Sequence, residues 1–418
     1  MKFTLNNKTI KNINKIVDKR KDELIAFLRE MIKTPSLSGH EKDVAELMAE
    51  KMREVGFDKI QIDEFNDVIG IIKGEGTGEN VLFNGHLDHV PPGDMEDPFS
   101  GKIMNGSKFG LDGKVIYGRG ACDMKGALAA MVMAGATLKE INVKTKGDIY
   151  ITASVMEEKG GSLGTKAIIE RKDIQPKIAV IGEATNLNIA IGHRGTAYIE
   201  VIVCGKSSHA SNPNAGINAI YKATKIIDEI QGITPRLPVH PILGRTLVNV
   251  TNIFAKPGSV NVIPYECCLQ IDARFIPEFT NEDIIRFIEK IISDLKHIDP
   301  NLDAGVRIAT GKLHLPSGEV KIYQELMPPL FTDPNENVIQ KSVQVVRSVA
   351  GINPKVTVWN FATDGGWFSK AGMITFGLGP GDEKFAHTSQ ENISVTQVLM
   401  ATKIYSILAC ILSEKVNS

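Results

Sequence analysis

The chain has few cysteines and few aromatic residues, and its charges almost cancel. Its 418 residues include five cysteines and 6% aromatic residues, and 48 lysines and arginines against 49 acidic residues give a net charge of −1. A balance so close to zero gives no reason to expect nucleic acid or an anionic membrane as a partner. The cysteines are odd in number and mostly far apart, which favours reduced thiols in a cytoplasmic protein over a disulfide framework.

Long uncharged apolar runs are also missing. No stretch of about 18 such residues occurs, so we expect no transmembrane helix. The opening residues, MKFTLNNKTIKNINK, have neither an uncharged apolar core nor a small-residue cleavage site, so we expect no signal peptide. Hydrophobic residues at 43% and charged residues at 23% are ordinary for a globular protein with sizeable cores. The composition therefore predicts a soluble protein that acts on small molecules.

The first part of the chain alternates helical and strand patterns. Apolar residues at helical spacing predict a helix within 10–33. Ser38 and Glu41 have the spacing of a capping box, which predicts a second helix that ends at Gly56. Further elements expected here are a helix at 124–138 and buried strands at 81–83, 149–155 and 177–181. This alternation predicts a sheet between layers of helices, with ligands beyond the carboxyl ends of its strands.

The middle of the chain has a different pattern. Residues 196–203 (TAYIEVIV) alternate by twos, which is typical of a strand with one face in water. Other elements expected in this part are helices at 214–231 and 283–295 and strands at 247–254, 268–275 and 307–310. After Leu315 the first pattern returns, with helices at 337–350, 365–370 and 395–412 and strands at 355–358 and 373–376. We therefore predict an α/β domain formed by residues 1–195 and 313–418, with a small α+β domain, residues 196–312, inserted into it.

Five segments concentrate histidine, aspartate and glutamate. They are FNGHLDHVPPGD (83–94), YGRGACDMKG (117–126), SVMEEKGGSLGT (154–165), VIGEATN (180–186) and KFAHTSQE (384–391). Neutral imidazole and carboxylate suit zinc, manganese or cobalt. Two cations about 3.5–4 Å apart, bridged by a carboxylate, can polarise a carbonyl and generate hydroxide near neutral pH. Each segment alone is a weak signal, because a His-X-Asp after a strand is more often a surface feature and paired glutamates are usually solvated.

The order and flanking residues of the five segments are more informative together. They resemble the family that contains acetylornithine deacetylase, succinyl-diaminopimelate desuccinylase, glutamate carboxypeptidase and aminoacylase-1. The resemblance covers nearly all of residues 15–415. It implies a zinc-aminopeptidase-like catalytic domain with a central mixed sheet, and an inserted domain that serves as lid and dimerisation surface. It also implies two zinc ions as cofactors, with cobalt or manganese as alternatives.

The resemblance assigns metal ligands residue by residue. Asp123, in GRGACDMKG, matches the carboxylate that bridges the two metals. The other expected ligands are His86 and Glu183 on the first metal and Glu158 and His387 on the second. In relatives the peptide bond after the bridging aspartate is cis, which implies a cis bond between Asp123 and Met124.

The resemblance also implies how the proton moves. Glu157 matches the general base, which acts on the water between the metals and later passes a proton to the leaving nitrogen. Asp88 is expected to accept the second ring N–H of His86 and so to fix its tautomer. The adjacent acids would thus have different roles, with Glu158 on a metal and Glu157 on the water.

Three further segments suggest contacts with the substrate. GHRG (192–195), GSVNVIP (258–264) and DARF (272–275) resemble family segments that suggest Arg194, Asn261 and Arg274 as substrate contacts. Because a planar guanidinium pairs with a carboxylate through two hydrogen bonds, we infer a substrate with a free carboxylate beside the scissile amide. The alternative is that these side chains form surface ion pairs.

GKSSHASNPNAGINAI (205–220) resembles the start of the family's lid domain. His209 corresponds to a histidine that, in dimeric relatives, crosses to the partner's site and stabilises the oxyanion, an interaction worth about 3–4 kcal/mol. This implies a homodimer formed through the lid, in which a separated monomer is nearly inactive. The alternative is a histidine that caps a helix or fills a core locally.

Other residues of reactive type are expected to be structural. His89 has no family role, and Cys122 is read as a small residue under a tight turn. The glycine-rich segment 377–382 (GLGPGD) lacks the lysine and Ser/Thr of a phosphate loop and resembles the family's turn beside the substrate.

We therefore predict a metal-dependent deacylase, desuccinylase or carboxypeptidase that cleaves the amide bond of an N-acyl amino acid or short peptide. The segments 376–391 and 192–195 favour the branch of YgeY-like hydrolases. The rival enzyme is a dipeptidase or aminopeptidase of the same fold, in which Asp often replaces the residue at the position of Glu158. A silent binding protein would be expected to have lost the Glu157-type base or a ligand, and two-metal phosphoester hydrolysis does not fit the flanking motifs.

Overall fold

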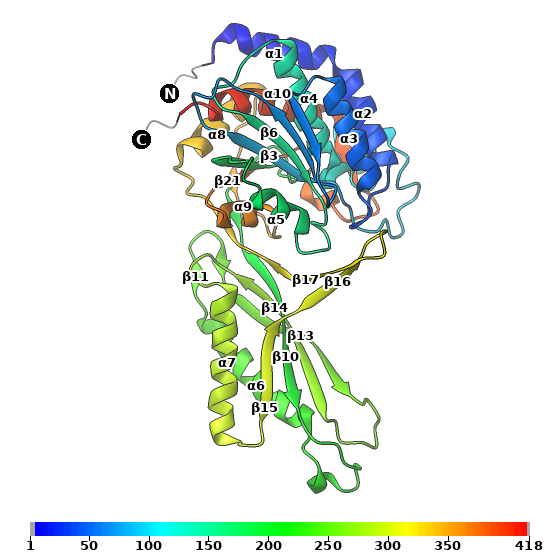
Figure 1. The fold of residues 1–418 in the computed structure, drawn as a ribbon, viewed down its shortest axis with the longest axis vertical. Helices are drawn as coiled ribbons and strands as arrows, with labels where there is room; N and C mark the ends of the chain where they lie inside the picture. Colours follow the sequence, from blue (N-terminus) through cyan, green and yellow to red (C-terminus); the bar gives the residue numbers. More distant parts are fainter. Residues whose placement is uncertain (1–4, 416–418) are drawn as a thin grey trace.

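The computed structural model describes residues 5–415 and shows an elongated molecule with two bodies (Figure 1). The upper body in Figure 1 contains both ends of the described chain, whereas the lower body, coloured green to yellow, is formed by the middle of the chain. One domain is therefore inserted into another. We refer to the upper body as the catalytic domain and to the lower body as the lid domain.

An eight-stranded sheet forms the centre of the catalytic domain. Its strands are β1 (Lys59–Ile62), β2 (Val68–Ile72), β3 (Val81–His86), β6 (Ile149–Ser154), β7 (Ile178–Ile181), β8 (Ile189–Ala190), β20 (Val356–Thr357) and β21 (Ile374–Gly377). They lie in the order β1-β2-β6-β3-β7-β21-β8-β20. The central run from β6 to β21 is parallel, whereas β1 and β2 are antiparallel to their neighbours, so the sheet is mixed, as predicted.

Helices cover both faces of this sheet. One face carries α1 (Asn7–Lys19), α2 (Lys21–Lys33), α3 (Lys42–Glu54), α4 (Gly126–Glu140), α8 (Asn337–Ala350) and α10 (Val395–Leu412). The other face carries α5 (Leu163–Glu170) and α9 (Gly365–Lys370). Alternate residues of a strand enter different cores: in β7, Val180 packs into the first core and Ala179 into the second. Burial on both faces explains why these strands read as continuous apolar runs.

A small three-stranded sheet lies beside the main one. It consists of β4 (Lys102–Asn105), β5 (Lys114–Tyr117) and β22 (Asn392–Ser394). Because β5 leads into the turn that carries Asp123 and β22 follows the segment that carries His387, this sheet brings together two parts of the chain that hold predicted metal ligands.

The lid domain is an antiparallel sheet with helices on one face. Its strands lie in the order β13 (Leu247–Lys256), β14 (Glu266–Phe275), β10 (Gly195–Cys204) and β15 (Asp303–Ile308). Two helices, α6 (Ala219–Ile233) and α7 (Asn281–Ile298), cover it. Every second residue of β14 is buried, which is the alternation expected of a sheet with one wet face. A short hairpin, β11 (Val239–His240) and β12 (Gly244–Arg245), lies outside this sheet.

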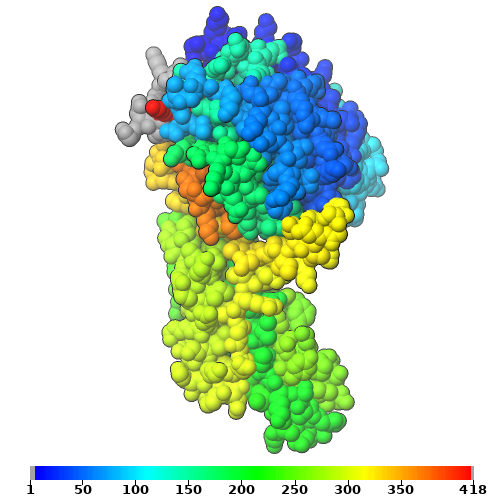
Figure 2. Space-filling model, in the orientation of Figure 1, coloured from blue at the N-terminus to red at the C-terminus, as the bar shows by residue number. Residues whose placement is uncertain are grey.

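Two segments of the chain cross between the domains, and they pair with each other on both sides of the junction. On the catalytic side, β9 (Gly192–His193) pairs with β19 (Leu330–Phe331), and on the lid side β10 pairs with β18 (Leu326–Met327). Before β18 the chain forms a hairpin of β16 (Thr310–His314) and β17 (Val320–Gln324), which reaches from the lid to the upper body (Figure 2). Leu313 and Tyr323 of this hairpin pack into the catalytic core, while β18 extends the lid sheet beyond residue 312, where we placed the domain boundary.

Two predictions near the start of the chain are wrong. The helix expected within 10–33 is two helices that meet at Arg20. The capping box does not form, because Ser38 Oγ donates to Asp88 and Glu41 accepts from the amide of Met156. As a result, α3 begins only at Lys42.

Two helices are long and apolar enough, by length and composition alone, to cross a membrane. They are Ala121–Glu140, which includes α4, and Val395–Leu412, which is α10. Within the protein, 94% of the apolar part of the first helix and 72% of that of the second are buried. The two helices pack against each other in the catalytic core, and an all-round apolar surface is what such a core helix requires.

Candidate metal centre and catalytic loop

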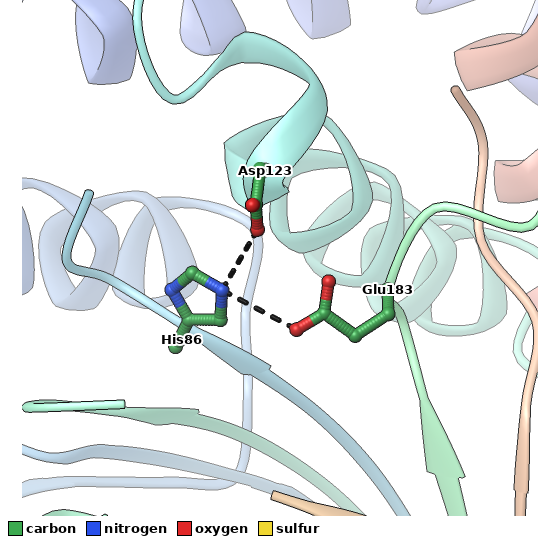
Figure 3. Close-up of side chains that lie close together, drawn as sticks. All are labelled: His86, Asp123 and Glu183. Atoms are coloured by element: carbon green, nitrogen blue, oxygen red, sulfur yellow. Dashed lines mark hydrogen bonds and ion pairs between the residues drawn. The ribbon is translucent and has the colours of Figure 1, made fainter. Parts of the chain in front are cut away.

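The first cluster of predicted ligands lies at the carboxyl ends of two neighbouring parallel strands (Figure 3). His86 ends β3, Glu183 follows β7, and Asp123 comes from the turn before α4. The Nε2 atom of His86 lies 3.0 Å from Asp123 Oδ1 and 3.3 Å from Glu183 Oε1. The edge of the sheet therefore brings together three residues that are far apart in sequence, where the strand pattern placed them.

A second cluster shares Asp123 with the first. The Nε2 atom of His387 lies 3.0 Å from Asp123 Oδ2 and 2.9 Å from Glu158 Oε1. The two carboxylate oxygens of Asp123 thus face different histidines, which is the geometry that a bridging ligand needs. The peptide bond between Asp123 and Met124 is cis, as predicted.

These two clusters fit a pair of metal ions. In each, one ligand atom from every member lies within 4.8 Å of the others. Hydrogen bonds to Asp123 and Glu158 raise the pKa of His387 to about 10, and burial followed by the charge of Asp123 raises the pKa of Glu183 to about 7. The raised pKa values mean that His387 and Glu183 bind protons more tightly beside the other carboxylates, and divalent cations bound there would displace those protons. Imidazole and carboxylate donors suit zinc, cobalt or manganese equally.

A residue that sequence reasoning did not single out holds the bridging aspartate. Glu391 is fully buried, and its Oε1 atom accepts hydrogen bonds from the amides of Cys122 and Asp123, both at 3.0 Å. Its other oxygen pairs with Arg119 at 2.6 Å. Glu391 ends one of the five acidic segments, and its position immediately before β22 was the available signal.

Asp88 orients the site differently from the prediction. The Nδ1 atom of His86 is 3.0 Å from the backbone carbonyl of Asp88 but 3.5 Å from its carboxylate. The carboxylate instead accepts from the amides of Glu157 and Glu158, at 3.1 and 3.0 Å, and from Ser38 Oγ. The carbonyl therefore fixes the tautomer of His86, while the side chain fixes the backbone of the two glutamates.

Glu157 lines a cavity of about 360 Å³ whose walls come from both domains. Burial raises the pKa of this carboxyl well above its usual value, opposed by the nearby charge of His86. Arg274 and Thr196 of the lid sheet line the same cavity, together with Glu325. The predicted base and one predicted substrate contact therefore face a common space.

Arg274 already has partners in this cavity. Its Nε and Nη2 atoms pair with the carboxylate of Asp272, and its Nη1 atom donates to Thr196 Oγ1 at 2.9 Å. Arg194 donates to the carbonyl of Arg245, and burial followed by the charge of Arg274 lowers its pKa. Both arginines thus lie at the lid end near the catalytic domain, and the ion pair weighed as an alternative for Arg274 is present.

His209 and Asn261 lie at the other end of the lid. Ala210 donates its amide to the carbonyl of Asn261, so the two predicted residues are neighbours, and both side chains are exposed. β10 has 10 residues and separates this end from Thr196, a span of about 30 Å at strand rise. The chain therefore does not bring His209 or Asn261 to its own metal clusters in this conformation.

Residues expected to be structural have structural contacts. His89 accepts from the amide of Ser36, and burial lowers its pKa to about 4. Burial raises the pKa of Cys122 well above its usual value, which makes it a poor nucleophile. All five cysteines are free thiols, as predicted. A Cβ atom at Gly379 would lie 2.0 Å from the carbonyl oxygen of Gly182, so the glycine-rich turn packs directly behind Glu183.

A mixed sheet that carries two imidazole–carboxylate clusters sharing one aspartate is the arrangement expected of a metal-dependent hydrolase. Residues 82–410 match the family described as Peptidase family M20/M25/M40, and the chain belongs to this family of hydrolases that act on peptide bonds. It is 29% identical over 403 residues to the uncharacterized protein YgeY of Escherichia coli K12, covering 94% of this chain and 96% of YgeY.

Solved structures show the same fold. Aminopeptidase PepT from Bacillus cereus superposes with a TM-score of 0.71 at 20% identity, covering 94% of this chain and 99% of PepT. The YXEP protein of Bacillus subtilis, described as a dinuclear metal binding peptidase, has a TM-score of 0.70 at 16% identity, covering 96% of this chain and all of YXEP (100%). The predicted family and fold class are therefore confirmed.

Proposed function

We propose that the protein is a zinc-dependent deacylase or carboxypeptidase that hydrolyses the amide bond of an N-acyl amino acid or short peptide. The observation that carries this proposal is the position of Asp123, whose two oxygens face His86 and His387, one in each cluster. Glu157, the predicted base, lies in the loop that follows strand β6 and adjoins the predicted ligand Glu158.

Two cations bound by these clusters would polarise the substrate carbonyl and lower the pKa of a water molecule between them. Glu157 would take the proton from the attacking water and deliver it to the leaving nitrogen. The buried surroundings that raise the pKa of this carboxyl suit the first step, because they make the ionised carboxylate a stronger base toward the attacking water. The backbone of Glu157 is held by Asp88, which fixes the direction of the side chain.

A carboxylate on the substrate could accept hydrogen bonds from the N–H groups of Arg274 that Asp272 and Thr196 do not engage. A guanidinium carries five N–H groups, and Asp272 and Thr196 occupy three of them. One N–H on each terminal nitrogen remains, which is the pair needed to bind a carboxylate through two hydrogen bonds. The acyl group and amino-acid side chain of the substrate depend on the rest of the cavity wall.

A homodimer formed through the lid would complete the site. His209 is exposed, and because the amide of Ser211 donates to its Nδ1, the neutral ring carries its proton on Nε2. That N–H is the donor that an oxyanion requires. The lid sheet ends in the edge strand β13, which exposes Ile253 and Phe254, and an exposed apolar edge is suited to pairing with a second copy.

An aminopeptidase or dipeptidase remains the alternative function, and one observation favours it. Glu325 is a half-buried carboxylate on the wall of the cavity that Glu157 lines. Burial raises its pKa, and a substrate ammonium group would be a suitable partner for it. Turnover of free dipeptides but not of N-acyl amino acids would favour this alternative.

The test combines metal analysis with a substrate screen. Purified protein should contain close to two transition-metal ions per chain and should hydrolyse members of a panel of N-acetyl, N-succinyl, N-formyl and N-carbamoyl amino acids and dipeptides. Glu157→Ala should abolish turnover while retaining the metals. Absence of stoichiometric metal, or unchanged turnover in Glu157→Ala, would contradict the proposal.

A further inference from the structure

The loop that carries Glu157 and Glu158 is held by carboxylates rather than by a neighbouring strand. Four successive backbone N–H groups, those of residues 155–158, each donate to a side-chain carboxylate. Asp88 accepts the last two of these hydrogen bonds. The first two go to residues outside the established site: Val155 donates to Asp67 Oδ1 at 2.9 Å, and Met156 donates to Glu41 Oε1 at 3.0 Å.

The three acceptors come from separate parts of the catalytic domain. Glu41 precedes α3, Asp67 precedes β2, and Asp88 follows β3. Their relative exposures are 1%, 0% and 0%, so all three are removed from water. Removing a carboxyl group from water is costly unless hydrogen bonds compensate it, and each of these three side chains accepts at least one from a backbone N–H. Their shared target is the short segment that presents the predicted base.

The backbone of this segment explains the need for such acceptors. Met156 has a φ of 60°, in the left-handed region that side-chain-bearing residues seldom occupy. The chain therefore leaves the path of β6 at this residue, and its amides no longer point at an adjacent strand. Such a conformation costs roughly 1–3 kcal/mol and persists only where surrounding contacts hold it. Asp67 and Glu41 supply such contacts to the two amides that lead into the bend.

A fourth buried carboxylate connects the two ends of the loop. Asp364 is 2% exposed, and its Oδ2 atom accepts from Ser154 Oγ at 2.7 Å and from Thr165 Oγ1 at 2.6 Å. Ser154 ends β6 and Thr165 lies in the first turn of α5. The base is thus carried on a loop whose ends are fastened together and whose first amides are individually held.

We infer that Glu41 and Asp67 are positioning residues, which set the direction of Glu157 by fixing the backbone immediately before it. This inference rests on the proposed role of Glu157 as the base. It assigns to the Ser38–Glu41 segment a role in catalysis in place of the helix capping suggested by its sequence. A displacement of a reacting group by about 1 Å can reduce turnover about 10²-fold, so the effect should appear in kcat.

The experiment separates hydrogen-bond reach from charge at position 41. Glu41→Gln keeps a carbonyl oxygen at the same distance from the amide of Met156, whereas Glu41→Asp keeps the acid but withdraws the acceptor by one methylene. Burial and the charge of Asp88 raise the pKa of Glu41 to about 8, so glutamine closely resembles the protonated side chain. We expect Glu41→Asp and Glu41→Ala to lower kcat by about 10–100-fold with KM changed less than about twofold. Glu41→Gln should retain most of the activity.

Asp67 is tested in the same way with Asp67→Asn and Asp67→Ala. The asparagine variant should be active and the alanine variant impaired in kcat. Asp148→Ala is the matched control, because Asp148 accepts the amide of Gly74 at 3.0 Å at the opposite end of β6. Hydrogen–deuterium exchange gives a readout that does not need activity: amides 155–158 should exchange faster in Asp67→Ala and Glu41→Asp than in the wild type or in Asp148→Ala.

The outcomes distinguish this inference from the function on which it rests. If Glu157→Ala is inactive but Glu41→Asp and Asp67→Ala keep full kcat, the positioning role is overturned and the proposed function stands. Greater loss in Glu41→Gln than in Glu41→Asp would overturn it as well, because charge and not reach would then matter. If the wild type has no amidase activity, unchanged exchange of amides 155–158 in these variants would overturn the structural part of the inference by itself.

Discussion

The residues predicted to be functional have very different surroundings in the two domains. In the catalytic domain, His86 is 2% exposed and contacts two other ligands, and Glu391 holds the bridging Asp123 from behind. In the lid domain, His209 and Asn261 are exposed and lie beyond the far end of a 10-residue strand. The metal-binding half of the site is therefore complete within one chain, whereas the lid half provides groups that have no target in their own subunit.

This difference separates two kinds of functional residue. A cluster of like charges has to be assembled by the fold itself, since uncompensated carboxylates are costly to bury. A side chain that donates a hydrogen bond to the transition state can remain in water until the site closes or a partner binds, because an exposed histidine pays no desolvation free energy. The comparison predicts that changes to the candidate ligands of the catalytic domain will affect metal content, whereas changes to His209 in the lid will affect turnover with the metals still bound.

The largest effect is expected for the residue that both clusters share. Asp123→Asn removes one anionic bridge from two metals, so we expect metal content to fall and activity to drop by about 10³-fold or more. Metal analysis and kinetics check this, with Asp97→Asn as an exposed control, because Asp97 forms its ion pair with Lys102 on the surface. Full occupancy in Asp123→Asn would remove the basis for calling this residue a bridge.

The next effect is expected in the lid. His209→Ala should lower kcat by about 10²–10³-fold and leave the metal content unchanged. Mixing this variant with inactive Glu157→Ala should restore about a quarter of wild-type activity, because half of the dimers are hybrids with one intact site. If the mixture stays inactive, the subunits do not share sites and the contrast between the domains needs another explanation.

Acid should remove the contribution of His193 to the stability of the catalytic domain before it removes that of Asp299 in the lid domain. Burial lowers the pKa of His193 from 6.5 to about 4. Between these values the unfolded chain binds a proton that the folded chain does not, so stability falls as the pH drops through this window, by about 3 kcal/mol for this residue at pH 4. In the lid, hydrogen bonds from Lys222 and Lys225 lower the pKa of Asp299 to about 2, so their contribution persists to lower pH.

Urea unfolding of the wild type and His193→Gln measures this contribution, at intervals from about pH 7.5 to about pH 4.5. The stability of the variant should depend less on pH than that of the wild type. Parallel curves would show that His193 is not the group responsible.

The smallest effect is expected for the substrate contact. Arg274→Ala should raise KM by about tenfold for a substrate with a free carboxylate and change kcat little, because this binding is the same in ground and transition states. Arg307→Ala is the control, since Arg307 lies in the same sheet and pairs with Glu200. An equal rise in KM for a substrate amidated at that carboxylate would show that Arg274 acts in another way.

Much of the architecture could be predicted from local sequence. α8, α9 and α10 begin and end at the predicted residues, because the buried apolar residues of each helix lie within these bounds. The metal ligands were predictable because several follow buried strands within distinctive segments. The break at Arg20 was not, since the amphipathic pattern continues across it and only the turn between two packed helices interrupts the backbone.

The contacts of Glu391 and Asp67 could not be predicted from the sequence, for a different physical reason. Glu391 contacts the turn at Cys122 across 269 residues, and Asp67 contacts Val155 across 88. A single acid in a sequence gives no sign of which amide it will meet. Ser38 and Glu41 show the converse, because their spacing matches a local motif while their hydrogen bonds go to distant parts of the chain.

The paired connection between the domains limits how the lid can move. The two crossing strands are bonded to each other on both sides of the junction, His193 with Leu330 and Thr196 with Met327. A ribbon of this kind bends and twists easily, but its strands cannot slide without breaking the ladder. The ribbon therefore favours rotation of the lid over sliding. Arg274 pairs with Thr196 next to the ribbon, so such a rotation would move Arg274 a short distance and His209, at the far end of the lid, a long distance.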